Sequence, residues 1–217
     1  MIVILLGAPG SGKGTQSKAL ASRFGFTHVS TGDIFRVEMA QQTELGKRAS
    51  EYVKSGKLVP DAIVTEMVAA KIEPGQKYLL DGFPRNVEQA QSLDKMVGQR
   101  KSAVDRVILL ELSHAEAMKR LTSRRVCAKC GEVYNIETKA PRSEGRCDTC
   151  GGDVVQRDDD SEATAKKRLM VFDDLTSPLI AYYKAEGLFE RVDAAQPPEK
   201  VTSDLARFFD SNGGASH

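Results

Sequence analysis

The chain of 217 residues has little that would direct it to a membrane or to a nucleic acid. No run approaches the roughly 18 consecutive apolar residues that a membrane-spanning helix needs. The apolar segment at residues 2–6 is too short for the core of a signal peptide, and no basic residue precedes it. A net charge of +1 gives no bulk attraction to DNA, RNA or a lipid surface. We therefore expect a cytoplasmic protein with no nucleic-acid or membrane partner.

Histidine is scarce as well, with only His28, His114 and His217 in the sequence. None of them belongs to a recognisable Ser/His/Asp arrangement, so nucleophilic catalysis of that kind is not indicated. His28 lies on an expected strand, where packing is a simpler role than catalysis. A cytoplasmic location also means that the four cysteines need an explanation other than disulfides.

What the sequence does contain is a glycine-rich segment, GAPGSGKGTQ, directly after the apolar residues 2–6. Gly7, Gly12 and Lys13 match the phosphate-loop pattern G-x-x-x-x-G-K-[ST], except that Gly14 takes the last position and Thr15 follows it. Such a loop binds phosphate through inward-pointing backbone N–H groups and a helix N-terminus. The alternative, a plain glycine-rich turn, leaves Lys13 without a role. The segment therefore predicts a nucleotide phosphate site.

Apolar strands alternate with helical patterns along the rest of the chain. We expect strands at residues 1–7, 27–30, 77–81, 104–112 and 188–192. We expect helices at residues 15–24, 32–56, 60–68, 87–96, 113–125, 163–174, 178–185 and 198–209, with a frayed tail at 211–217. Turn signals lie near Gly46 and Gly56, and Ser113 with Glu116 forms a capping-box pattern. This alternation predicts a parallel sheet with right-handed crossovers.

The character of the sequence changes between residues 127 and 156, where apolar residues become few. Sixteen residues separate the pair Cys127 and Cys130 from the pair Cys147 and Cys150. This spacing fits a structural zinc site with a closed shell of four thiolates. Two redox-active pairs are the alternative, but neither pair opens a helix after a strand. We expect a metal that replaces the hydrophobic core that a segment of about 30 residues cannot supply.

Arginines are frequent at the ends of the expected strands and beside the cysteine segment. A planar guanidinium gives a phosphate two parallel hydrogen bonds, and phosphoryl transfer depends on positioning and charge neutralisation. Any one of these arginines could be a solvated surface residue, but their positions favour a shared phosphate site. The candidates are Arg36, Arg85, Arg120, Arg124, Arg125, Arg157 and Arg168.

Aspartates occur at the same places. Asp33 and Asp81 follow expected strands and could orient water around Mg²⁺, although Asp81 could instead cap a turn. Asp159 and Asp160 are interpreted as a hinge or cap, in preference to a solvated acidic run.

Together these residues resemble the adenylate kinases, which belong to the nucleoside monophosphate kinases. The similarity covers essentially the whole chain, and the order and spacing of the motifs match too. The matching stretches are GAPGSGKGTQ at 7–16, STGDIFR at 30–36, GKLVPD at 56–61, DGFPRN at 81–86, RLTSRRVC at 120–127, CGEVYN at 130–135 and R-x-D-D-x-E at 157–162, with Arg168 beyond. The resemblance is to the long form, whose ATP lid carries metal knuckles.

The resemblance implies an α/β fold of the P-loop NTPase type with three layers. Its five-stranded parallel sheet would have the order 2-3-1-4-5, with helices on both faces. The core domain would comprise residues 1–29, 60–126 and 157–217, with a helical AMP-binding flap at 30–59 and a zinc-binding ATP lid at 127–156. The implied reaction is reversible phosphoryl transfer from Mg²⁺-bound ATP to AMP, giving two ADP, in a monomer with structural Zn²⁺.

Carried onto this sequence, the resemblance implies an ATP site in which Lys13 bridges toward the transferred group. The other residues of that site would be Gly10, Ser11, Gly12, Gly14, Thr15, Arg124, Val133, Tyr134 and Gln196. The AMP site would comprise Thr31, Arg36, Lys57, Leu58, Val59, Gly82, Phe83, Pro84, Arg85, Gln89, Arg157 and Arg168. The catalytic cations would be Lys13, Arg36, Arg85, Arg120, Arg124, Arg157 and Arg168.

Two positions depart from the family pattern. Asn86 replaces a commoner Thr, and Gln196 stands where some members have Lys, so its contact with adenine could be through the backbone.

Other functions remain open at this point. A kinase acting on UMP or CMP is the nearest alternative, although Thr31 and Gln89 favour adenine because their side chains can read its edge. A zinc-ribbon ATPase that binds nucleic acid is a second alternative, and the near-neutral charge speaks against it. A nucleotide sensor without turnover is a third, and the many arginines disfavour it.

Overall fold

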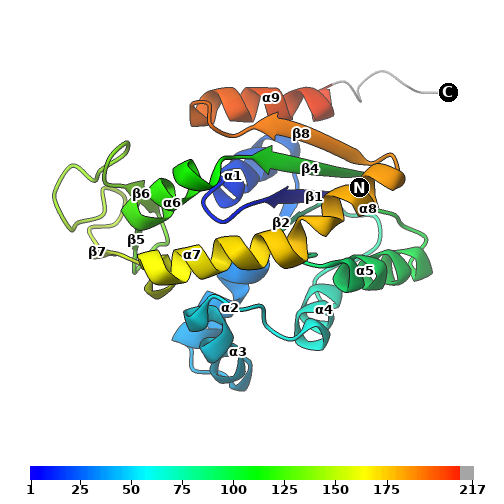
Figure 1. The fold of residues 1–217 in the computed structure, drawn as a ribbon, viewed down its shortest axis with the longest axis horizontal. Coiled ribbons are helices and arrows are strands. Elements are labelled where there is room, and N and C mark those ends of the chain that lie inside the picture. Colours follow the sequence, from blue (N-terminus) through cyan, green and yellow to red (C-terminus); the bar gives the residue numbers. More distant parts are fainter. Residues whose placement is uncertain (211–217) are drawn as a thin grey trace.

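Five parallel strands form the central sheet of the computed structural model, which describes residues 1–210 (Figure 1). They are β1 (Ile2–Gly7), β2 (Thr27–Ser30), β3 (Tyr78–Asp81), β4 (Arg106–Glu111) and β8 (Phe189–Asp193). Their order across the sheet is β2-β3-β1-β4-β8, and every neighbouring pair is parallel. Counted along the chain, this is the order 2-3-1-4-5, which confirms the predicted fold class. The tail expected at 211–217 lies outside the described residues.

Helices connect these strands and cover both faces of the sheet. They are α1 (Lys13–Phe24), α2 (Thr31–Ala40), α3 (Glu44–Ser55), α4 (Asp61–Ala69), α5 (Val87–Gln99), α6 (His114–Ser123), α7 (Glu162–Val171), α8 (Pro178–Ala185) and α9 (Pro198–Asp210). A 3-10 turn (η1, Asp158–Asp160) precedes α7, and a π-helix (η2, Phe172–Thr176) joins α7 to α8. No helix within residues 1–210 is long and apolar enough to cross a membrane.

The alternation of side chains along the buried strand β1 creates two separate cores. Ile4 belongs to one cluster together with Leu93 of α5 and Leu179 of α8. Val3 faces the other way and belongs to a second cluster with Leu20 of α1 and with residues of α9. In Figure 1, α1 and α9 accordingly lie on one side of the sheet, and α7, α8 and α5 lie on the other.

The helical stretch predicted at residues 32–56 is two helices, α2 and α3. The chain breaks between them, where Gln42 has a positive φ of 54°. Gly56 ends α3 in the left-handed conformation, as its turn signal predicted. The turn expected near Gly46 lies at residues 41–43, and Gly46 itself is in the first turn of α3. A Cβ there would be 2.1 Å from the carbonyl oxygen of Glu38, so this glycine permits a close approach between α2 and α3.

The cysteine segment folds separately as a small antiparallel sheet of three strands in the order β6-β5-β7. Its strands are β5 (Arg124–Cys127), β6 (Val133–Asn135) and β7 (Val154–Val155). Gly131 and Gly151 follow the second cysteine of each pair with φ values of 72° and 68°. These left-handed positions form the tight turns that the sequence predicted.

The start of α6 confirms only half of the predicted capping box. The Ser113 hydroxyl accepts the backbone N–H of Glu116 at 3.3 Å, as an N-cap residue does. The Glu116 carboxylate turns away and accepts Nε of Arg120 at 2.8 Å. This hydrogen bond ties Arg120 to the first turn of α6 and fixes the position of its side chain.

Candidate active site

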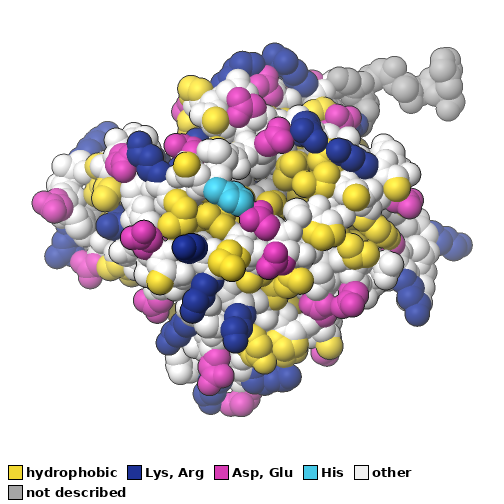
Figure 2. All heavy atoms as spheres, in the orientation of Figure 1, with side chains coloured by type: hydrophobic (Ala, Val, Ile, Leu, Met, Phe, Trp, Pro, Cys, Tyr) yellow, Lys and Arg dark blue, Asp and Glu magenta, His cyan; other side chains and the backbone are white. Residues whose placement is uncertain are grey.

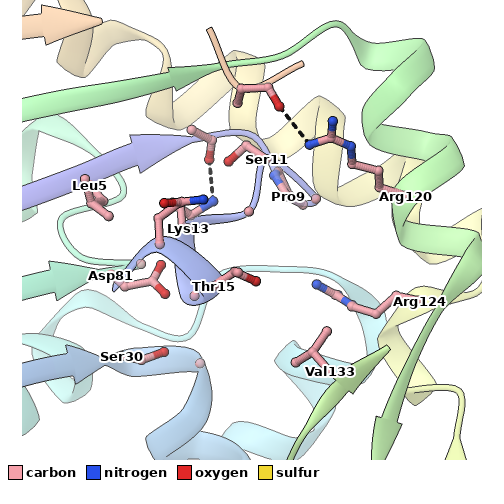
Figure 3. Close-up of a pocket in the computed structure, with 18 of the residues that line it drawn as sticks. Leu5, Pro9, Ser11, Lys13, Thr15, Ser30, Asp81, Arg120, Arg124 and Val133 are labelled. Atoms are coloured by element: carbon pink, nitrogen blue, oxygen red, sulfur yellow. Dashed lines mark hydrogen bonds between the residues drawn. The ribbon is translucent and has the colours of Figure 1, made fainter. Parts of the chain in front are cut away.

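A cavity of about 780 Å³ opens where β1 and β3 end (Figure 3). Its walls come from the loop after β1, the loop after β3, α6, the strand β6 and the segment between β8 and α9. The carboxyl ends of strands are where open parallel α/β sheets bind their ligands. The fold therefore brings segments from nearly the full length of the chain to one polar cavity.

The loop between β1 and α1 forms one wall and adopts the backbone that phosphate binding requires. Gly10 and Gly12 have φ values of 86° and 92°, a region that favours glycine. A Cβ on Gly10 would also lie 2.8 Å from the carbonyl oxygen of Ala117. Because α1 begins at Lys13, its first backbone N–H groups have no partners within the helix. The buried hydroxyl of Ser11 also has no partner among residues 1–210, so the loop offers donors to an anion.

Lys13 supplies the positive charge of this loop. Its Nζ donates to the carbonyl oxygens of Gly7 at 2.7 Å and Ala8 at 3.0 Å. Burial lowers the pKa of Lys13 to about 8, against the opposing attraction of Asp81, and Arg85 adds repulsion in the same direction. A phosphate next to Nζ would favour the charged form again, so anion binding and protonation of Lys13 are coupled.

Arg85 lines the same cavity from the loop after β3, and three hydrogen bonds fix it. Its Nε donates to the carbonyl oxygen of Gly82 at 2.7 Å. Its backbone N–H donates to Oε1 of Gln89 at 2.7 Å, and its carbonyl oxygen accepts the hydroxyl of Thr176 in η2 at 2.7 Å. Burial and then repulsion from Arg168 lower the pKa of Arg85 to about 10. The guanidinium is thus held in a fixed place near other cations, which is a preformed anion site.

Arg124 and Arg168 share a buried carboxylate. Arg124 makes a bidentate pair with Asp160 at 2.7 and 2.5 Å, and Arg168 contacts the same side chain at 3.0 Å. Arg168 also pairs with Asp159 at 2.9 Å. Burial would raise the pKa of Asp159, but the neighbouring arginines lower it below its usual range. The sequence predicted a cap or hinge role for Asp159 and Asp160. In the structure these aspartates also neutralise two arginines of the cavity.

The remaining arginines differ in how free they are. Burial and then repulsion from Arg124 lower the pKa of Arg157 to about 10, and its Nε is buried without a hydrogen-bond partner in the described part of the chain. Arg36 pairs with Asp33 at 2.5 Å. Arg120 donates to the carbonyl oxygen of Ala194 at 2.9 Å (Figure 3). Arg157 is therefore the cation of the cavity that most needs an anionic ligand.

Most of the predicted site residues line this one cavity. They are Gly10, Ser11, Gly12, Lys13, Gly14, Thr15, Arg36, Leu58, Gly82, Pro84, Arg85, Arg120, Arg124, Val133, Tyr134, Arg157, Arg168 and Gln196. Five others stand outside its lining: Thr31, Lys57, Val59, Phe83 and Gln89. Val59 and Phe83 are buried in the main core. Thr31 donates its hydroxyl to the carbonyl oxygen of Gly82 at 2.9 Å, directly behind the cavity wall.

Asp81 ends β3 and lies beside the phosphate loop. One of its carboxylate oxygens is 3.6 Å from Nε2 of His28 and would be 3.6 Å from a Cβ on Gly14. Thr15 is exposed nearby and lines the same cavity. These oxygens are the kind of ligand that Mg²⁺ and its bound water prefer. His28 therefore lies beside a carboxylate of the site, and the strand pattern did not indicate this contact.

The four cysteines converge on one point. Their Sγ atoms all lie within 4.8 Å of one another, with Cys127 and Cys150 at 3.4 Å and Cys130 and Cys147 at 3.5 Å. Four thiolates at about 2.3 Å from a zinc ion would be about 3.8 Å apart, so the cluster fits that ion. The hydroxyl of Tyr134 donates to Sγ of Cys147 at 3.4 Å. The ring of Tyr134, predicted to contact ATP, is thus directed to the cysteine cluster.

A phosphate loop at the end of a central strand, facing a group of fixed arginines, defines a class of enzyme. Cations from separate parts of the chain surround a space for several phosphate groups, and the loop itself provides the donors for a polyphosphate. The fold and the site together are those of a P-loop enzyme that transfers phosphoryl groups between nucleotides.

Comparisons with known proteins narrow this class to one family. The family model described as adenylate kinase matches residues 5–188. The chain is 47% identical to an adenylate kinase of Clostridium acetobutylicum over 94% of this chain and 97% of that protein. It is 46% identical to one of Streptomyces avermitilis (93% and 94%) and 48% identical to one of Caldicellulosiruptor bescii (87% and 89%). The chain belongs to the adenylate kinase family, and it is a nucleoside monophosphate phosphotransferase.

Proposed function

We propose that the enzyme transfers the γ-phosphoryl group of ATP reversibly to AMP and forms two molecules of ADP. The observation that carries this proposal is that Lys13 and Arg85, from the loops after the neighbouring strands β1 and β3, line one cavity. Lys13 belongs to a loop suited to a triphosphate, and Arg85 belongs to a second, separately fixed anion site. Two anion sites that share one space suit a donor and an acceptor nucleotide.

The proposed division of the chain follows from this arrangement. Residues 30–59 would be the AMP-binding flap, residues 127–156 the ATP lid, and residues 1–29, 60–126 and 157–217 the core. ATP would meet the loop at residues 10–15, the lid and the segment at Gln196. AMP would meet the flap, the loop at residues 82–85 and Gln89. The exchange of Asp159 and Asp160 for nucleotide phosphates would release Arg124 and Arg168 for the reaction.

The chemistry requires no general base. An oxygen of the AMP α-phosphate is already anionic, so it can form a bond to the γ-phosphorus while the bond from that phosphorus to the β,γ-bridging oxygen breaks. Fixed guanidinium groups neutralise the charge of the transferred group, and alignment of the two nucleotides supplies the rest of the rate. Mg²⁺ bound with ATP would shield the triphosphate charge, with Asp81 and Thr15 placed to hold it or its water.

Water is the competing nucleophile, so the site should close over both nucleotides before transfer. Arg36 belongs to residues 30–59, and Arg124 lies in β5 just before residues 127–156. Both line the cavity, and each is paired with an aspartate. Zn²⁺ on the four cysteines would keep the lid folded as it moves.

The test is ADP formation from ATP and AMP, with and without a chelator of Mg²⁺, and with CMP, UMP or GMP in place of AMP. The proposal expects Mg²⁺-dependent ADP formation with AMP as the preferred acceptor. Equal rates with UMP would contradict the assignment of the acceptor. Arg85→Ala should lower turnover by a factor of about 10² or more while the protein stays folded, by analogy with other charge-stabilising groups. Arg23→Ala, which removes an exposed ion pair with Asp210, is the matched control.

The nucleic-acid alternative makes a different prediction, namely retention of DNA or RNA that weakens steeply with salt. On the face seen in Figure 2, acidic and basic side chains are interspersed and form no broad basic surface. A filter-binding measurement at low salt decides between the two, because the proposal expects no retention.

A further inference from the structure

Asp61 is at the start of α4, outside the lining of the cavity, and each of its carboxylate oxygens accepts a hydrogen bond. Oδ1 accepts Nε2 of Gln89 at 2.6 Å, and Oδ2 accepts Nδ2 of Asn86 at 2.8 Å. Asn86 in turn accepts the backbone N–H of Gln89 at 2.8 Å as the N-cap of α5. Asn86 therefore helps to fix Asp61 against Gln89.

These contacts determine which way the amide of Gln89 points. A carboxylate can only accept hydrogen bonds, so Nε2 must face Asp61. The backbone N–H of Arg85 can only donate, so Oε1 must face Arg85, at 2.7 Å. Rotating the amide by 180° would place oxygen against oxygen and N–H against N–H. Both partners therefore oppose the flipped orientation.

Half of the hydrogen-bonding capacity of this amide remains unused. Gln89 is 1% exposed, and a primary amide has two N–H donors and two acceptor positions. Its side chain makes one bond through Nε2 and one through Oε1 among residues 1–210. Within residues 1–210, one N–H and one acceptor position of the amide thus have no partner, and their order along the amide is fixed.

A purine base can match that order in only one way. Adenine presents an amino donor at C6 beside an acceptor at N1. Hypoxanthine presents the reverse, an oxygen acceptor at C6 beside an N–H donor at N1. An amide that could rotate would accept either base, whereas an amide in one fixed orientation pairs with one of them and opposes the other. Cytosine and uracil differ from each other in the same sense.

We propose that Asp61 is a positioning residue that makes the acceptor site selective for a 6-amino base by preventing rotation of the Gln89 amide. This inference rests on the proposed function, since it assumes that Gln89 meets the base of the acceptor nucleotide. Asp61 itself touches no substrate in this account. It acts through the donor and acceptor chemistry of its neighbour.

The test compares kcat/KM for AMP and for IMP, with ATP as donor, in the wild type and in Asp61→Asn. Asparagine keeps the shape of the side chain but can face Gln89 with either an acceptor or a donor. We expect the preference for AMP over IMP to fall about tenfold, because one charge-assisted hydrogen bond no longer opposes the flip. The preference for CMP over UMP should fall in the same direction. A merely structural defect would lower both members of each pair by the same factor.

Asp94→Asn is the matched control, because it makes the same change on α5, where Asp94 accepts the hydroxyl of Tyr182 at 2.8 Å away from the cavity. Its AMP-to-IMP ratio should equal that of the wild type. If Asp61→Asn does not fold, Asn86→Ser keeps a capping oxygen and removes only the amide bond to Asp61, and the ratio should fall by a smaller factor. An unchanged ratio in a folded variant that still phosphorylates AMP overturns the inference. A wild type that does not phosphorylate AMP overturns the proposed function instead.

Discussion

Residues 30–59 and residues 127–156 are segments of equal length, but they are stabilised differently. The first contributes Phe35, Ala49 and Val59 to the main hydrophobic core. The second buries Cys127, Tyr134 and Cys147 in a small cluster of its own. So few buried groups cannot offset the conformational entropy of about 30 ordered residues. The first segment can therefore rely on the core of the protein, whereas we propose that the second relies on Zn²⁺ held by its four cysteines.

Removing the metal should have the largest effect, and it should affect one segment only. Structural zinc contributes on the order of 10 kcal/mol to the folding of small metal modules. In Cys147→Ser, or after chelation, we expect the amides of residues 127–156 to lose protection in hydrogen-exchange mass spectrometry while α2 and α3 keep theirs. Thr149→Ser, between the ligands, should behave like the wild type. Loss of protection in both segments together would show that they are not independent.

Truncating the core contact of the other segment should have the next largest effect. Phe35 is 4% exposed, so Phe35→Ala should lower the free energy of unfolding by about 3–5 kcal/mol. Val37→Ala, on the same helix but 52% exposed, should change it by less than about 0.5 kcal/mol. Urea unfolding followed by circular dichroism measures both. Equal losses in the two variants would mean that residues 30–59 do not depend on the core.

A smaller effect is expected where α2 and α3 approach each other. Gly46→Ala should cost about 1–3 kcal/mol, because the new Cβ would lie against the carbonyl oxygen of Glu38 and push the helices apart. Gly98 in α5 has open space around its Cβ position, so Gly98→Ala should stabilise by up to about 1 kcal/mol. In thermal unfolding, the melting temperature should fall in Gly46→Ala and rise in Gly98→Ala. A change in the same direction in both variants would contradict this expectation.

The phosphate loop lies outside both segments and should respond to pH independently of the metal. The pKa of Lys13 is about 8 in the free protein and should rise when phosphate binds, so binding takes up a proton above that pH. ATP affinity measured by calorimetry should be level below pH 7 and fall up to tenfold per pH unit above about 8. The ATP affinity of Lys13→Arg should stay constant through this pH range. If the pH at which ATP affinity begins to fall were different in the metal-free protein, the phosphate loop and residues 127–156 would be coupled.

Local patterns in the sequence were enough to locate the phosphate loop and the cysteine cluster. Both depend on residues close in sequence, such as Gly12 beside Lys13 and Cys127 beside Cys130. The order of the sheet came from the resemblance to a family, because strand pairing is not local. The boundaries of most helices followed from periodicity and from caps such as Ser113.

Contacts between distant residues were beyond these patterns. Arg124 and Asp160 are 36 residues apart, and the sequence does not indicate that they form a buried pair. In the sequence Gly46 resembles a turn residue. The close approach of α2 that requires a glycine there depends on tertiary packing, which the local pattern does not show. The hydroxyl of Tyr134 is directed at Cys147 because the small sheet turns it inward. In each case a tertiary partner determines the role of the side chain.

The central claim is that two nucleotides share one cavity, with their phosphates between Lys13 and Arg85. It is tested most directly by calorimetric titration with a bisubstrate analogue in which a polyphosphate chain joins two adenosines. The account predicts that one molecule binds per chain and that Lys13→Met and Arg85→Ala each weaken binding at least tenfold, the cost of about 1.4 kcal/mol or more per lost charged contact. Two molecules bound per chain, or full affinity in Arg85→Ala, would contradict it.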